Sequence, residues 1–199
     1  MLKKFSPRFV LLLVMVITTG CLRLLSVKYG GAFFNFTPIG ALALFGGAYF
    51  TQKWKAVMFP LLILFLSDLV IQRFIYGGAY GSVFYSGWYI TYGVFVLIVF
   101  AGGLIIKKVS LKSVLFAGIV ASLGHYLITD FFCWMGSCVN VTTGLPYTRD
   151  LRGLFDCYVL ALPFLKSFFM GTVFYSALLF GSFELALLRF PKLKVVNRS

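Results

Sequence analysis

The stretch that decides the fold of this chain spans residues 35–50 and reads NFTPIGALALFGGAYF. Thr37 followed by Pro38 predicts a helix start, since a hydroxyl caps free N–H groups and proline sets φ for the first turn. The residues that follow are apolar but small, and in a membrane small residues mark the faces where helices pack together. We therefore expect this helix to lie inside a crowded bundle.

The beginning of this helix has two interpretations. A helix N-terminus carries partial positive charge and unpaired N–H donors, so this start is able to hold an anion. A Thr-Pro pair also starts many helices that bind nothing, because a cap is first of all a local stabilising device. On the binding interpretation, Asn35 and Thr37 are candidate binding residues.

The composition is that of a membrane protein. The 199 residues are 61% hydrophobic and 12% charged, whereas about 25% of the residues in a soluble domain are charged. No long polar stretch is present to form a soluble domain, so we expect one integral membrane domain over residues 1–199. The net charge of +13 is divided among short basic clusters between apolar runs. That distribution sets membrane orientation and does not indicate a nucleic-acid partner.

Six apolar runs predict an all-α polytopic bundle of about six transmembrane helices. The runs lack the alternation of barrel strands, and backbone groups in lipid have to be satisfied internally. They cover residues 9–25, 37–50, 57–71, 88–106, 113–132 and 160–188. The first run could instead be a signal peptide ending at Gly20-Cys21. Thr18 and the apolar residues after Cys21 favour a retained helix.

The basic residues predict the orientation of the bundle. Most of them lie at the two termini and in the loops after the second and fourth runs, which places both termini in the cytoplasm of a bacterial inner membrane. They are Lys3, Lys4, Arg8, Lys53, Lys55, Lys107, Lys108, Lys112, Arg189, Lys192, Lys194 and Arg198. The outer loops are rich in glycine and aromatic residues, Trp134 among them. That composition suits either folded binding loops or an aromatic belt at the interface.

Four ionisable side chains lie near the outward ends of the predicted helices. They are Arg23, Asp68, Asp130 and Lys166. A charge at membrane depth is costly, so it usually pairs or lines a polar cavity. The four charges could pair with one another, or the two bases could extend to the interface. They could also line a solute cavity open to the outside, with Trp134 nearby. We expect them to converge at the start of the second helix, with Asn35 and Thr37 at the rim.

No residue pattern predicts a metal, a cofactor or catalysis. His125 has no Cys, Asp or Glu at i+3 or i+4, so a hydrogen-bonded histidine of the bundle is favoured over a metal ligand or proton relay. Glu184 lies near Arg189 and could pair there or meet a partner protein. The outer loop contains three cysteines, and we expect Cys138 to form a disulfide with Cys157 in an oxidising compartment.

Several segments resemble a known family. They are Arg23, residues 35–39 and 41–48, Pro60, residues 66–68, 147–148, 153–154, 157–158, 161–164 and 180–184. These segments resemble an uncharacterised bacterial membrane family labelled as candidate transport proteins. That family is similar to the substrate-binding S components of energy-coupling-factor transporters. The resemblance implies about six helices, both termini inside, and a pocket made by outer loops and helix ends. The bulky residues 11–19 depart from the small-residue face with which S components dock on their energising module.

The first functional hypothesis is a membrane subunit that captures a small solute from the outer side. An ATP-driven energising module would supply the energy, since the chain has no nucleotide-binding motif. An alternative is a structural or assembly protein of the cell envelope. A membrane enzyme acting on a lipid is a further alternative, although the chain contains no hydrolase, phosphate-loop or metalloprotease motif and we expect no enzyme.

Overall fold

In the computed structural model, residues 6–29, 35–75, 84–136 and 138–193 are described. Within these ranges the protein is all-helical, as the sequence predicts. The helices are α1 (Pro7–Tyr29), α2 (Ile39–Tyr49), α3 (Lys53–Val70), α4 (Trp88–Ile105), α5 (Leu111–Met135) and α6 (Leu151–Arg189). A π-helical turn, η2 (Ile71–Ile75), continues α3, and a short 3₁₀ turn, η3 (Pro191–Leu193), follows α6. All the α-helices except α2 are long and apolar enough to cross a membrane.

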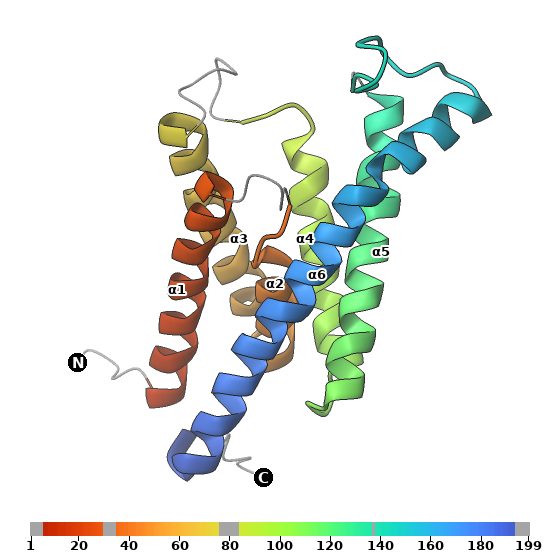
Figure 1. Ribbon diagram of the computed structural model, residues 1–199. Helices are drawn as coiled ribbons and strands as arrows, with labels where there is room; N and C mark the ends of the chain where they lie inside the picture. The colour runs from red at the N-terminus through yellow and green to blue at the C-terminus, as the bar shows by residue number, and fades with distance from the viewer. Residues whose placement is uncertain (1–5, 30–34, 76–83, 137, 194–199) are drawn as a thin grey trace.

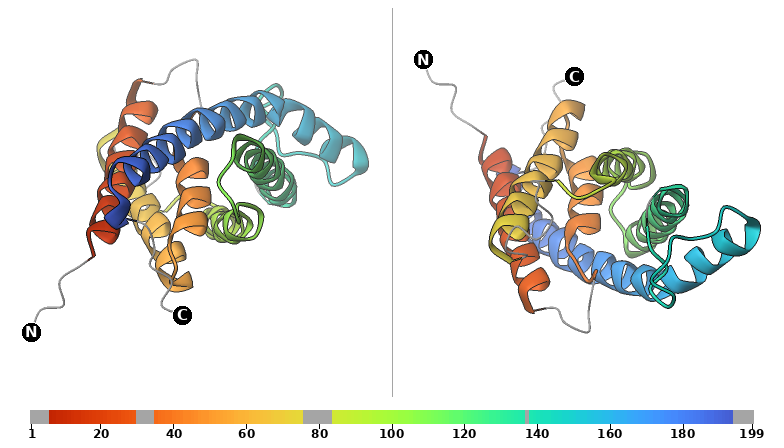
Figure 2. Two further views of the ribbon diagram at one scale, coloured as in Figure 1. Left: turned by 90° about the horizontal axis from the view of Figure 1, so that it is seen from below. Right: turned by 90° about the horizontal axis from the view of Figure 1, so that it is seen from above.

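Helix α2 is short and lies at the centre of the bundle (Figures 1 and 2). Its 11 residues correspond to about 16 Å at 1.5 Å per residue, roughly half of the hydrocarbon thickness of a bilayer. Every residue of α2 except Gly47 and Ala48 is buried. Helix α2 is therefore a half-length helix enclosed by its neighbours.

Small residues let α2 approach α3 and α4 closely, as the sequence predicts. A Cβ added to Gly46 would lie 2.7 Å from Pro60 Cγ and 3.0 Å from the Ala56 carbonyl oxygen. On α4, a Cβ added to Gly102 would lie 2.6 Å from the Leu44 carbonyl oxygen. Such backbone contacts are what small residues provide in membrane bundles.

The start of α2 differs from the prediction. The helix begins at Ile39 with Pro38 at the N-cap position, and no side chain caps it. Asn35 has a positive φ of 68°, and the Thr37 N–H donates to the Asn35 carbonyl at 2.9 Å. Because this tight turn brings Pro38 into the cap position, the prediction that Thr37 caps the helix with its hydroxyl was wrong.

The start of α1 and the end of α6 meet at one end of the bundle. The Arg8 guanidinium donates to the carbonyl oxygens of Leu193, at 3.1 Å, and Tyr49, at 3.3 Å. The Tyr49 hydroxyl in turn donates to Glu184 at 2.5 Å, so Glu184 helps to close this end. The start of α1 and the end of α6 therefore lie on the same side (Figure 1), and the cytoplasmic location of this side stays a prediction.

At the opposite end, α6 begins nine residues earlier than the predicted run. The Asp150 side chain caps it by accepting from the Gly153 N–H at 2.7 Å, which is why the helix starts at Leu151. The outer part of α6 leans away from α1 and α3 and extends past the end of α5 (Figures 1 and 2). Residues 30–34 and 76–83 of the other two predicted outer loops lie outside the described residues.

Candidate functional site

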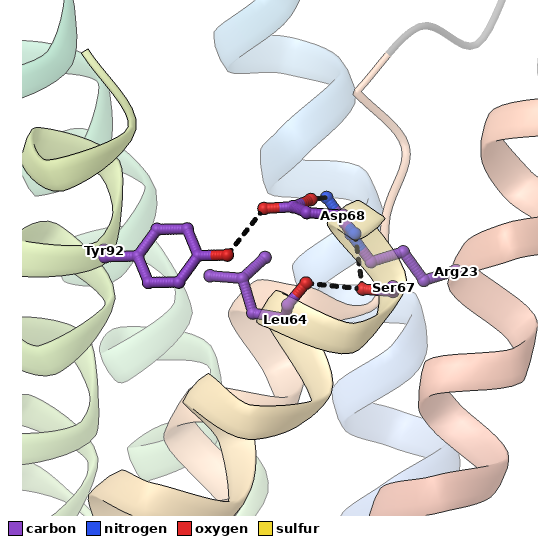
Figure 3. A network of polar contacts seen from close by, with 5 residues as sticks. All are labelled: Arg23, Leu64, Ser67, Asp68 and Tyr92. Atoms are coloured by element: carbon purple, nitrogen blue, oxygen red, sulfur yellow. Dashed lines mark hydrogen bonds and ion pairs between the residues drawn. The ribbon is translucent and has the colours of Figure 1, made fainter. Parts of the chain in front are cut away.

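A buried ion pair joins α1 to α3 (Figure 3). Arg23 Nη2 lies 2.6 Å from Asp68 Oδ1, and the two side chains are 14% and 7% exposed. The second guanidinium nitrogen, Nη1, donates to Ser67 Oγ at 2.5 Å, and the Ser67 hydroxyl donates to the Leu64 carbonyl at 2.9 Å. Arg23 therefore contacts two consecutive side chains in the last turn of α3.

Helix α4 completes this network through Tyr92. Its hydroxyl donates to Asp68 Oδ2 at 2.8 Å, so each carboxylate oxygen has a protein partner. Hydrogen bonds to an ionised group are stronger than neutral ones, and this one links α4 to the pair. Arg23, Ser67, Asp68 and Tyr92 are called the polar network below; they hold three helices together at one level of the bundle.

Two polar atoms, one in this network and one in the turn that continues α3, have no partner among the described residues. They are Arg23 Nε and Gln72 Oε1, and both are buried. Gln72 lies four residues after Asp68, in the π-helical turn η2. An unsatisfied buried polar atom costs about 1–3 kcal/mol, and π-helical turns are frequent at functional sites. The arrangement can offer one more donor and one more acceptor to a small polar molecule.

Tyr85 precedes α4 in the chain and lies close enough to the polar network for the Asp68 and Arg23 charges to act on it. Burial is the main cause that raises the pKa of Tyr85 above its ordinary value, and the Asp68 carboxylate raises that pKa further, while a hydrogen bond with Thr91 and the Arg23 charge lower it. The phenol is therefore neutral at physiological pH and able to donate a hydrogen bond.

Buried hydroxyls on α5 and α6 form a second polar group, and one of them, that of Thr172, lies against the start of α2. A Cβ added to Gly40 would overlap Thr172 Oγ1 and would lie 2.9 Å from Phe168 Cζ. The hydroxyls of Thr172, Ser122 and Ser176 are buried without a hydrogen-bond partner in the described part of the chain. His125 stacks on Phe168 with ring centroids 4.5 Å apart. Within the described residues, no three His, Cys, Asp or Glu side chains are arranged to hold a metal ion.

Asp130 and Lys166 do not join the polar network. The pair of Arg23 with Asp68 is the one ion pair found between described residues. Lys166 is exposed on α6, and Asp130 lies on α5, where its carbonyl accepts from the Cys157 thiol at 3.4 Å. The predicted convergence of four charges is therefore found for Arg23 and Asp68, and it stays a prediction for Asp130 and Lys166.

Asn35 and Thr37 were predicted to lie at the rim of the solute cavity, and Trp134 was a further candidate binding residue. The Trp134 indole N–H donates to the Thr148 carbonyl at 2.8 Å, so Trp134 helps to fold the loop between α5 and α6. Asn35 and Thr37 form the turn that leads into α2. These two residues precede the helix start that Thr172 contacts, and Trp134 belongs to neither polar group.

Sequence reasoning missed Tyr92, Gln72 and the contact made by Ser67. One signal was available: Ser67 precedes Asp68 directly, and Gln72 follows it at i+4, where helical residues share a face. Tyr92 carries a hydroxyl within an apolar run, but its direction toward Asp68 depends on how α4 packs.

The disulfide prediction was wrong. Cys133 pairs with Cys138, and their Cα atoms lie 5.2 Å apart. Cys157 is a buried free thiol, because α6 begins before it and packs it against α5. The partner of Cys138 is therefore the cysteine five residues earlier in the chain.

Comparison with known proteins identifies a family whose function is not known. The chain belongs to the family of unknown function DUF6580, whose model matches residues 3–193. No curated protein and no solved structure matches it.

Proposed function

We propose that this protein is the substrate-binding subunit of a transport system in the bacterial cytoplasmic membrane, and that it captures a small polar solute from the outer side. The observation that carries the proposal is the polar network together with two buried atoms that lack a partner among the described residues: Arg23 Nε in the network and Gln72 Oε1 four residues after Asp68. A purely structural ion pair at membrane depth would be expected to satisfy its own hydrogen-bonding groups, because each unmet group adds to an already large desolvation cost.

The chemistry of these atoms suggests the kind of solute. The Arg23 guanidinium is a rigid set of donors suited to a carboxylate or another oxygen acceptor. The Gln72 carbonyl oxygen accepts from a hydroxyl or an amine. A solute with both an acceptor and a donor group fits this pair of side chains.

The energy for transport would come from a partner. The chain has no nucleotide-binding motif, and its resemblance to the S components of energy-coupling-factor transporters supports an ATP-driven module. Because residues 11–19 of α1 are bulky, we expect the small residues of another helix, or a different surface, to take the place of the usual docking face.

The test is mass spectrometry of small molecules released from protein that was purified in native lipid discs. Wild type is expected to release a solute that Arg23→Lys does not retain, because lysine keeps the charge but lacks Nε and the planar donor set. Arg8→Lys, at the opposite end of the bundle, is the matched control and should retain the solute. The same small molecules from wild type and Arg23→Lys, or none from either, would refute the proposal.

A structural or assembly role is the second candidate. It is favoured by the way Arg23 and Tyr92 together satisfy both oxygens of Asp68. Gln72→Leu separates the two functions. If the role is structural, removing an unsatisfied buried carbonyl should leave thermal stability unchanged or raise it, and no ligand should be lost. If the site binds solute, Gln72→Leu should release the solute from a folded protein.

A further inference from the structure

Helix α2 starts inside the bundle. Ile39 is 5% exposed, and Pro38 is fully buried. The segment that leads to them packs against α6: a Cβ added to Gly171 would lie 3.0 Å from both the backbone nitrogen and the carbonyl oxygen of Thr37. Non-helical backbone at membrane depth is tolerated where it is buried in protein or lines a polar cavity. Gly171 therefore admits the turn at residues 35–38 into the interior.

The first turn of α2 presents backbone donors at this depth. The first N–H groups of a helix have no acceptor within the helix, and no side chain caps α2. The helix dipole adds partial positive charge at the same place. In lipid these N–H groups have to find an acceptor, because no bulk water reaches them.

A buried hydroxyl points at this turn from α6. Thr172 is 0% exposed, and its Oγ1 occupies the space that a Cβ on Gly40 would need. Within the described residues this hydroxyl has no hydrogen-bond partner. It is thus an independent polar group directed at the uncapped helix start.

Helix α5 adds a second hydroxyl to the same region. Gly118 lies beside Thr172, since a Cβ there would be 3.8 Å from Thr172 Cγ2. Ser122 follows one turn later on the same buried face, and its hydroxyl also lacks a partner among the described residues. Helices α2, α5 and α6 all contribute donors here. The acidic residues of α5 and α6, which are Asp130, Asp156 and Glu184, lie at least two helical turns along the chain from Ser122 and Thr172.

We propose that the N-terminus of α2 and the Thr172 hydroxyl form a buried site for a carboxylate. The inference rests on the proposed function and deepens it: the bound carboxylate is the acidic group of the captured solute. Phe95 on α4 approaches His125 and Phe168, with ring centroids 5.5 and 6.3 Å apart, and Tyr92 precedes it by three residues. The carboxylate site therefore lies about one helical turn inward from Asp68. A solute with a carboxylate at α2 and an amine or hydroxyl near Asp68 and Gln72 fits both groups.

Formate, the smallest carboxylate, is the probe. The temperature of half-unfolding is measured in lipid discs during titration with sodium formate, against sodium gluconate at the same ionic strength as a bulky reference. Wild type is expected to show a saturable rise of several degrees, because a ligand that binds only the folded state stabilises it. Thr172→Val, which keeps the shape and removes the hydroxyl, should lose most of that rise.

The matched control is Thr19→Val. Thr19 is also buried in the bundle, but its hydroxyl donates to the Met15 carbonyl at 2.7 Å, away from α2. Thr19→Val should keep the formate response, and Thr172→Ser should restore it. If Thr172→Val does not fold, Thr172→Ala introduces no overlap and takes its place.

An unchanged formate response in Thr172→Val, an equal loss in Thr19→Val, or no response in wild type would each overturn the inference. A rise with sodium chloride that equals the rise with formate would assign the site to a free halide and would also overturn the carboxylate assignment. A formate response that requires Thr172, in a protein from which no solute is ever released, would support the carboxylate site and refute solute capture. Solute release that depends on Arg23 but not on Thr172 would refute only the site at α2.

Discussion

At the scale of single residues, Asp68 is the centre of the described polar contacts between α1, α3 and α4. Its two oxygens accept from side chains 45 and 24 residues away in the chain. Removing one partner of a buried charge leaves the other uncompensated, which costs more than the contact itself contributes. The consequence differs between the two partners, because Arg23 carries charge and Tyr92 does not.

Tyr92→Phe tests the weaker of these contacts. The change removes the hydroxyl and keeps the ring, so it should lower the free energy of unfolding by about 1.5–3 kcal/mol, the range for a hydrogen bond to a charged group. Chemical unfolding in detergent measures it. Tyr89→Phe, on an exposed ring of the same helix, should change the free energy by no more than about 0.5 kcal/mol. Equal effects of the two changes would contradict the assigned contact.

At the scale of elements, glycines on α2 and α4 let the two backbones touch. Phe45 fixes the other side of α2 against α6, with ring centroids 5.4 Å from Phe180 and 5.7 Å from Phe183. Helix α2 is thus held between a glycine contact and an aromatic contact. Its short length depends on neither; it follows from the turn at residues 35–38.

Gly102→Ala should destabilise the bundle by about 1–3 kcal/mol, the usual cost of overpacking. The added Cβ would lie 2.6 Å from the Leu44 carbonyl oxygen and 2.9 Å from Leu44 Cα, and backbone atoms do not move aside easily. Gly93→Ala on the same helix meets nothing within 4 Å and should be neutral or slightly stabilising, since alanine favours helix. Thermal unfolding of the two variants in the same detergent checks this prediction. If Gly102→Ala loses less stability than Gly93→Ala, the backbones of α2 and α4 lie further apart than the structure places them.

The stability of the first turn of α6 should depend on pH. The Gly153 N–H, and next the Thr148 hydroxyl, donate to Asp150 and lower the pKa of its carboxyl below the ordinary value. The stabilisation from this cap is therefore present above the unfolded pKa, near 4, and is lost as the pH falls through the lower folded pKa. Amide hydrogen exchange near Leu151 should accelerate in that acidic range. Asp150→Asn should remove this pH dependence, while Asp156→Asn should preserve it.

At the scale of the whole molecule, most of the described basic residues flank the starts of α1, α3 and α5 and the ends of α4 and α6, which lie at one end (Figure 1). The disulfide Cys133–Cys138 lies at the other end. A disulfide is expected on an oxidising side of the membrane. The charge bias and the cysteine pairing thus favour the same orientation.

Impermeant thiol reagents test that orientation. In a background without other free cysteines, Trp54→Cys should react only after the cytoplasmic side is opened, since Trp54 is 58% exposed and is flanked by Lys53 and Lys55. Asp150→Cys should react in intact cells. Reaction of Trp54→Cys from outside would contradict this orientation and place the Trp54 loop on the outer side.

The sequence by itself determined the class of fold and much of the arrangement. Apolar runs bounded by basic clusters specify helices and predict their direction, because the bilayer forces internal hydrogen bonding and the charges bias insertion. The small residues after Pro38 likewise specified a buried, closely packed helix. Arg23 and Asp68 stood out because charges are rare in apolar runs.

Only the tertiary structure decided which groups meet. Whether Asp68 faces Arg23, Lys166 or lipid depends on the rotation and lean of each helix, and packing sets both. The same holds for the cysteines: an earlier start of α6 buried Cys157 and left Cys138 to Cys133. The depth of the α2 start, with Thr172 at its first turn, arises from a backbone turn against Gly171 on a distant helix. No local pattern encodes that contact, because its two sides are more than 130 residues apart in the chain.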